Sequence, residues 1–184
     1  MRRPIVPLLG FLALLVAGCA SSSAVDPKDP KLSLVYGYID MAAAPSSLGW
    51  VRIKLYDGKN QGYSAAVKKG LFFHVGVEPG PYQVERFGRH TTFFSNTEYS
   101  YDFGTRGRND TAIRIDQPGV YFMGAYKYVE IHTGWFEQSK FKMERTETPS
   151  ERELLARLAS ILQEDYPQYT RQIAMVRQRL AQLR

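Results

Sequence analysis

Residues with the types and spacing needed for catalysis are scarce in this chain of 184 residues. Its three histidines, His74, His90 and His132, lie in separate segments and lack the H-x-H or H-E-x-x-H spacing of metal sites. No G-x-S-x-G or S-x-x-K motif marks a nucleophilic serine, and Gly104 and Gly107 lack the strand-to-helix context of a phosphate-binding loop. The sequence therefore predicts no catalytic residue, no metal site and no cofactor.

The most specific pattern surrounds Cys19, the single cysteine of the chain. Arg2 and Arg3 precede an apolar run from Ile5 to Val16, which is shorter than the roughly 20 residues that span a bilayer. Small residues close the run directly before the cysteine, in the order Leu15, Val16, Ala17 and Gly18. This arrangement predicts an export signal over residues 1–18.

The same segment resembles the lipobox of bacterial lipoproteins. The resemblance implies that the chain is cleaved after Gly18 and that Cys19 becomes the first mature residue, carrying a diacylglycerol and an amide-linked acyl chain. Each buried CH₂ contributes about 0.8 kcal/mol, so two or three acyl chains form a stable membrane anchor. Ala20, where a sorting rule of Gram-negative lipoproteins would place Asp for retention, implies the outer membrane. An ordinary cleaved signal with an incidental cysteine is the alternative.

Residues 19–31 are small, polar and interrupted by Pro27 and Pro30. They predict an acylated flexible tether, on the order of 30 Å long when extended. Cleavage would remove Arg2 and Arg3 and so lower the formal charge of +6 by two. No segment is then a strong basic patch.

A group of arginines lies among aromatic residues in the middle of the chain, and two interpretations are open. Solvated arginines on loops are one; a clamp for an anion, such as lipopolysaccharide phosphate, peptidoglycan or an acidic protein face, is the other. Export makes nucleic acid an unexpected ligand. The group comprises Arg86, Arg89, Arg106, Arg108 and Arg114.

Residues 32–147 have the composition of a β protein, with short Val, Ile, Tyr and Phe segments separated by Gly, Pro, Asn and Asp. With no helical pattern between the strands, the fold class expected is mainly β, an antiparallel sandwich or barrel, of which the antiparallel β-sandwich is preferred. The candidate strands are Leu32–Ile39, Trp50–Tyr56, Tyr63–Val67, Leu71–Val77, Tyr82–Phe87, Thr91–Phe94, Glu98–Phe103, Thr111–Ile115, Val120–Ile131 and Trp135–Met143.

Two strand entries repeat a pattern, since Pro79-Gly80 and Pro118-Gly119 each stand before a segment that contains tyrosine. Pro followed by Gly suits a type II turn, in which the glycine takes a positive φ. The pattern resembles the strand entries of transthyretin-like and carboxypeptidase-regulatory-like β-sandwich modules, most of which bind partners or serve as scaffolds. The alternative is an antiparallel protein that simply uses Pro-Gly turns.

Residues 148–184 change to Leu, Ala, Gln, Glu and Arg, which predicts C-terminal amphipathic helices as a hairpin or one kinked helix. Thr148 as N-cap with Glu151, or Ser150 with Glu153, forms a capping box. The first apolar stripe is Leu154, Leu155, Leu158, Ile161 and Leu162. The second includes Tyr169, Ile173, Val176 and Leu180, which are also the candidate partner-docking residues. The stripes pack on the β body, dock a partner or second copy, or lie on a membrane surface.

The function expected from these patterns is that of a non-enzymatic lipoprotein of the cell envelope, an interaction, scaffold or assembly module with an envelope protein as partner. A glycan- or peptidoglycan-binding module and an envelope hydrolase are the alternatives. The mixed Tyr, Phe, Ser and Asn of residues 87–108 suit either glycan recognition or a β core. In the second case Tyr99 and Tyr101 fill the core.

Overall fold

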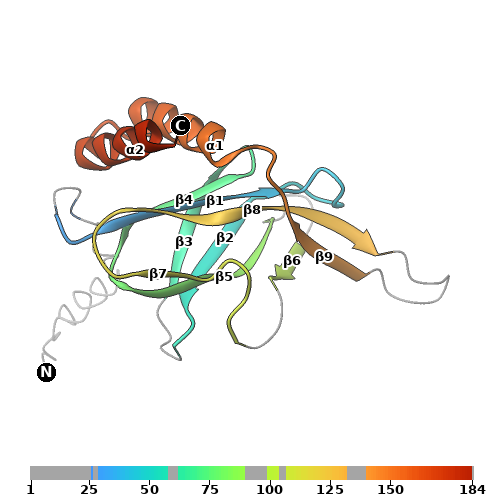
Figure 1. Ribbon diagram of the computed structural model, residues 1–184. Coiled ribbons are helices and arrows are strands. Elements are labelled where there is room, and N and C mark those ends of the chain that lie inside the picture. The colour runs from blue at the N-terminus through green and yellow to red at the C-terminus, as the bar shows by residue number, and fades with distance from the viewer. Residues whose placement is uncertain are drawn as a thin grey trace, which may run out of the picture.

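The computed structural model describes residue 26 and residues 29–57, 62–89, 99–103, 107–131 and 140–183. The chain is mainly β and ends in two helices, as the composition predicts (Figure 1). The strands are β1 (Ser33–Asp40), β2 (Trp50–Leu55), β3 (Gly62–Lys68), β4 (Leu71–Val77), β5 (Gly80–Arg89), β6 (Tyr99–Asp102), β7 (Ile113–Ile115), β8 (Val120–Ile131) and β9 (Lys140–Arg145), and the helices are α1 (Glu151–Asp165) and α2 (Thr170–Gln182).

The strands form one mixed sheet, so the predicted antiparallel sandwich needs correction. Eight strands follow the order β6-β5-β2-β3-β4-β1-β8-β9, and β7 pairs with β5 beside this path. All pairings are antiparallel except β1 with β8, which run parallel over Leu34 to Asp40. The sheet curls around its own inner face, so one sheet encloses the core that two facing sheets would enclose in a sandwich.

The first core fills the inside of this curl. Strand β2 alternates between buried and more exposed residues, and its Val51, Ile53 and Leu55 are buried in this core. The two ends of the sheet approach each other there: the rings of Tyr101 on β6 and Phe141 on β9 have centroids 5.1 Å apart. Aromatic contacts between strands that share no hydrogen bonds therefore close the curl.

The second core lies between the outer face of the sheet and the helices, which cover β1, β4 and β8 (Figure 1). Tyr36 of β1 is fully buried in it and donates a hydrogen bond of 3.1 Å to Glu151 Oε1. Burial, and then the adjacent Glu151 carboxylate, raise the pKa of Tyr36. Because Val35 and Ile39 face the first core, β1 is buried on both faces.

Nine of the ten candidate strands overlap strands of the structure. Thr91–Phe94 and residues 135–139 of the last candidate lie outside the described residues. The Pro-Gly pairs do lie at the entries to β5 and β8, where Gly80 is the first residue of β5 and Gly119 precedes β8. The predicted type II turns are wrong, since Gly119 has no positive φ and Gly80, at φ 159°, is nearly extended. Instead, the missing side chain of each glycine leaves room for a tyrosine ring. A Cβ on Gly80 or Gly119 would lie 3.2 or 3.0 Å from the ring of the tyrosine two residues later.

Helix α1 begins at the second of the two predicted capping boxes. Ser150 is the N-cap, its hydroxyl accepts the Glu153 N–H, and the Glu153 carboxylate accepts the Ser150 N–H at 2.8 Å. The box with Thr148 as N-cap does not form, because the backbone becomes helical only at Glu151. The first apolar stripe is buried in the second core as a whole.

Candidate functional site

The lipobox residues Leu15, Val16, Ala17, Gly18 and Cys19 lie outside the described residues. The four candidate docking residues belong to the second core. Within it Ile173 and Val176 are buried, and Tyr169 and Leu180 are half-buried. The structure thus has α2 packed on its own sheet, and a partner would reach this stripe only if the helix left the sheet.

His74 is the one histidine among the described residues, and it does not face a metal site. Its Nδ1 lies 3.0 Å from the carbonyl oxygen of Ser64, and its ring centroid is 4.7 Å from that of Tyr63. Burial lowers the pKa of His74. Across the described part of the chain, no group of three or more His, Cys, Asp or Glu side chains could hold a metal ion.

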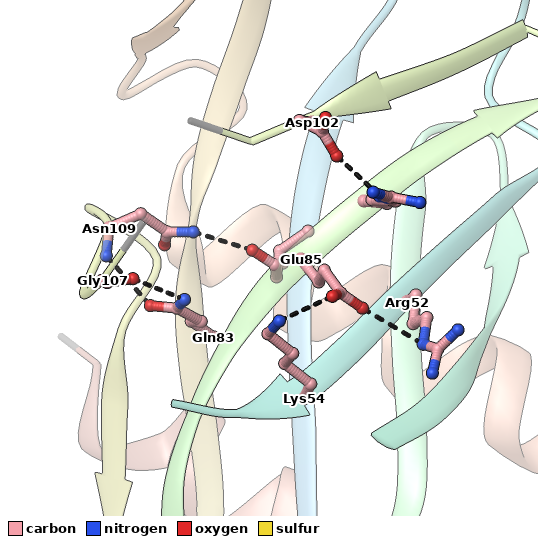
Figure 2. Close-up of polar contacts among 9 residues, drawn as sticks. Arg52, Lys54, Gln83, Glu85, Asp102, Gly107 and Asn109 are labelled. Carbon is pink, nitrogen blue, oxygen red and sulfur yellow. Dashed lines mark hydrogen bonds and ion pairs between the residues drawn. The ribbon is translucent and has the colours of Figure 1, made fainter. Parts of the chain in front are cut away.

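A group of polar contacts covers the outer side of β2, β5 and β6 (Figure 2). We call it the polar face and define it as Arg52, Lys54, Gln83, Glu85, Arg86 and Asp102. It lies opposite the first core, because the neighbouring residues Val51, Ile53, Val84 and Phe87 point inward. Alternation along β2 places Arg52 and Lys54 on this outer side, and Glu85, Arg86 and Asp102 lie there as well. Gln83 is buried beneath the segment before β7, to which it is hydrogen-bonded.

A β-bulge in β5 sets the geometry of the polar face. Arg52 pairs with Arg86 while Ile53 pairs with Val84, so Glu85 is an extra residue in β5. Bulges commonly redirect a side chain. Here the Glu85 carboxylate lies between two cations of β2, 3.2 Å from Arg52 Nε and 2.6 Å from Lys54 Nζ (Figure 2).

The arginines of the central segment are mostly engaged by partners within the chain. Arg86 Nε lies 2.7 Å from Asp102 Oδ1, and Arg114 Nε lies 2.8 Å from Asp116 Oδ1. The Arg108 guanidinium stands 5.9 Å from the ring centre of Tyr56, a cation–π contact. Arg106 falls outside the described residues. These contacts support solvated, paired arginines over a preformed anion clamp.

The chain before β7 fastens the free edge of β5 beside the bulge. Gln83 Nε2 donates to the Gly107 carbonyl at 2.8 Å, and the Asn109 N–H donates to Gln83 Oε1 at 2.9 Å (Figure 2). Asn109 Nδ2 donates to the Val84 carbonyl, and the Val84 N–H donates to Thr111 Oγ1, both at 2.8 Å. Between the part of β5 that pairs with β7 and the part that pairs with β6, these side chains thus take the place of a partner strand. They make this part of the polar face rigid.

The polar face has three cations and two carboxylates, because Arg52 and Lys54 share Glu85 while Arg86 pairs with Asp102. The Arg86 and Asp102 side chains are 55% and 67% exposed, whereas Glu85 is 23% exposed. Exposed ion pairs contribute only about 0–1 kcal/mol each. Groups this open to water suit hydrogen bonding to a large polar partner, and they lack the enclosure that shifts an acid and a base apart for catalysis.

Sequence reasoning missed the polar face, although one signal was present. Val84 and Phe87 are both core residues but stand three positions apart, which breaks the period of two expected of a strand. That break marks the bulge at Glu85. The roles of Asn109 and Thr111 had no comparable signal, because their partners lie 25 to 27 residues away.

The aromatic residues near β6 divide between core and surface. Tyr101 is only 8% exposed, and its ring stacks on Phe87 with centroids 5.3 Å apart. Tyr99 is 40% exposed at the beginning of the strand. The core interpretation therefore applies to Tyr101, while Tyr99 is available for recognition.

An open depression of about 430 Å³ lies at another part of the sheet, between the end of β1 and the turn after β3. Its charged lining groups are Asp40 and Lys69. The Asp40 carboxylate already accepts the Ala42 N–H at 2.9 Å.

In the described residues, neither helix is long and apolar enough to cross a membrane.

Comparisons with known proteins found little. No protein-family model matches the chain, and no curated protein matches it. Among solved structures, the chain is similar to a DUF3823 family protein from Parabacteroides merdae ATCC 43184, with 13% sequence identity and a TM-score of 0.28. The match covers 64% of this chain and spans 60% of the length of that protein, and at this TM-score it carries no argument about function.

Proposed function

We propose that this protein is a lipid-anchored component of the bacterial cell envelope, held at Cys19 in the outer membrane, whose β-rich body binds another envelope protein. The observation that carries the interaction role is the polar face: a hydrated array of charged side chains on the outer surface of one sheet. Such a surface offers charge complementarity to a partner, which determines specificity more than affinity.

Anchoring at Cys19 is the first part of the proposal to test. Cells supplied with a clickable fatty acid are expected to label the intact chain and to leave the Cys19→Ala variant unlabelled. A Ser21→Ala variant is the matched control, because it changes a neighbouring residue without removing the thiol. Equal labelling of the two variants would overturn anchoring at this residue.

The interaction role is tested by reversing charges on the polar face. Swapping Arg86→Asp together with Asp102→Arg keeps an ion pair on β5 and β6 but reverses its polarity. A partner that recognises this face is expected to be lost from in-cell crosslinking. The same reversal at Arg114 and Asp116, an exposed pair elsewhere, is the control and is expected to retain the partner.

Surface exchanges are preferred to removal of the helices, because deleting residues 149–184 would uncover the second core. Any lost contact would then report unfolding. If neither exchange changes a crosslink that depends on the intact protein, the polar face is not the binding surface.

A glycan-binding module is the second candidate, favoured by the exposed ring of Tyr99 at the beginning of β6, opposite Arg89 of β5. It predicts that the chain from Ala20 onward is retained on peptidoglycan and that Tyr99→Ala reduces retention. Tyr101→Ala is unsuitable for this purpose, since Tyr101 is part of the first core. Unchanged retention of the Tyr99→Ala variant would remove this candidate.

A further inference from the structure

One arginine joins the segment before β1 to the second helix. Arg171, in the first turn of α2, donates to three main-chain carbonyl groups: those of Asp29 and Leu32 at 3.2 Å and that of Pro30 at 2.7 Å. A planar guanidinium presents several donors in fixed directions, so it holds a bent stretch of backbone in a way that an ammonium does not.

The start of β1, next to this segment, is also hydrogen-bonded to the turn before β8. The Ser33 hydroxyl accepts the Gly119 N–H at 3.2 Å, and the Leu34 N–H donates to the Gly119 carbonyl at 2.9 Å. The start of β1 is therefore fixed between the turn before β8 and the first turn of α2. We call this region, residues 29–34, 117–119 and 170–174, the tether end.

The chain length before the tether end limits the distance to the proposed lipid anchor. Cys19 and Asp29 are ten residues apart in the sequence. Ten residues span at most about 35 Å, even when fully extended. Strand β8 begins at the tether end. Its opposite end, near Glu130, lies roughly 33 Å farther along the strand.

The charge of α2 is compatible with a nearby anionic surface. The helix contains Arg171, Arg177 and Arg179 and no acidic residue. Arg179 is paired with Glu151, whereas Arg171 faces main-chain carbonyl groups, which carry no net charge. Anionic headgroups attract such cations over about a Debye length.

From these contacts we propose that the tether end faces the bilayer and that Arg171 fixes this orientation by holding residues 29–32 on α2. This inference rests on the proposed anchoring at Cys19. It assigns Arg171 a positioning role, and it turns the end of β8 near Glu130 away from the membrane.

Energy transfer from single labels to the membrane tests the orientation. The chain from Ala20 onward contains no cysteine. It can therefore be attached through an N-terminal hexahistidine tag to phosphatidylcholine vesicles that carry a nickel-chelating lipid and a headgroup acceptor dye. Donor dyes are placed at Gln117→Cys or Ala174→Cys at the tether end, and at Glu130→Cys at the far end. All three residues are exposed.

We expect the donor to lose more fluorescence at positions 117 and 174 than at position 130. Arg171→Ala and Arg171→Lys should both reduce this difference, because lysine keeps the charge but cannot make the same set of hydrogen bonds. Arg177→Ala, a matched loss of an arginine on the same helix, should leave it unchanged. Equal transfer from all three positions in the unaltered chain would overturn the orientation.

An unchanged difference in both Arg171 variants would overturn the role of this residue. Because the tag replaces the acyl anchor, these results do not depend on lipidation of Cys19. Failure of the orientation is thus distinguishable from failure of the proposed anchoring, which fatty-acid labelling measures.

Discussion

Two glycines with nearly the same positive φ differ in their surroundings, which makes them a matched pair. Gly124 has φ +106° at a bulge in β8, and a Cβ there would lie 2.5 Å from the Tyr126 ring. Gly107 has φ +110° and open space. Positive φ costs a residue other than glycine about 1–2 kcal/mol. We expect Gly107→Ala to lose about that much.

Gly124→Ala should lose more, because the Tyr126 ring is fully buried and must also move. Forcing extra atoms into a packed core typically costs about 1–3 kcal/mol. Denaturant-induced unfolding of both variants measures the difference directly. Equal losses would show that Tyr126 adjusts freely and that the bulge tolerates a side chain.

His74 predicts a dependence of stability on pH. Burial lowers its pKa in the folded chain below the ordinary value of 6.5, so the unfolded chain binds a proton more readily. The contribution of His74 to the free energy of unfolding is therefore complete above pH 6.5. It is lost as the pH falls through the lowered pKa of the folded chain, and it amounts to about 1.4 kcal/mol for each unit of pKa difference.

The free energy of unfolding measured across this pH range checks the sign. A His74→Gln variant should show a weaker decline on acidification than the unaltered chain. His90 and His132 remain in both proteins, so their titration cancels in the comparison. The same decline in the two proteins would contradict a role for His74.

At the scale of elements, the start of α1 distinguishes between the two capping boxes that the sequence predicts, one with Thr148 and one with Ser150 as N-cap. Ser150→Ala removes a side-chain cap and should cost about 1 kcal/mol of stability. Thr148→Ala changes the other candidate, whose exposed side chain caps nothing, and should be almost neutral. Thermal unfolding followed by circular dichroism compares the two. A larger loss at Thr148 would place the helix start two residues earlier.

Strand positions were predictable because local patterns determine them. The alternation in β2 and β9 identifies the inward residues before any partner strand is known, and both patterns appear in the structure. The bulge at Glu85 was less accessible, because its effect depends on cations contributed by another strand. The polar face is a product of register between β2 and β5, which a single sequence does not specify.

At the scale of the whole molecule, the pairing that determines the architecture joins distant segments. Leu34 of β1 lies beside Val120 of β8, in parallel. Nothing local indicates this partner. The unbroken run Leu34-Val35-Tyr36 did contain a signal, since a strand buried on both faces loses the alternation of a half-exposed one. That signal predicts a central strand and two cores, which a sandwich interpretation leaves out.

Because β1 contributes to both cores, the helices and the sheet should unfold as one unit. Leu158 of α1 is fully buried in the second core, and Leu158→Ala should cost about 2–5 kcal/mol. Arg157→Ala, at the exposed neighbouring position, is the control with little expected effect. In a Trp135→Phe background, where Trp50 of β2 is the remaining tryptophan, helix circular dichroism and tryptophan fluorescence should shift together in the Leu158 variant, as two-state unfolding requires. Loss of the helix signal ahead of the fluorescence would mean that α1 and α2 separate from a sheet that is stable without them, and the second core would then contribute little to the fold.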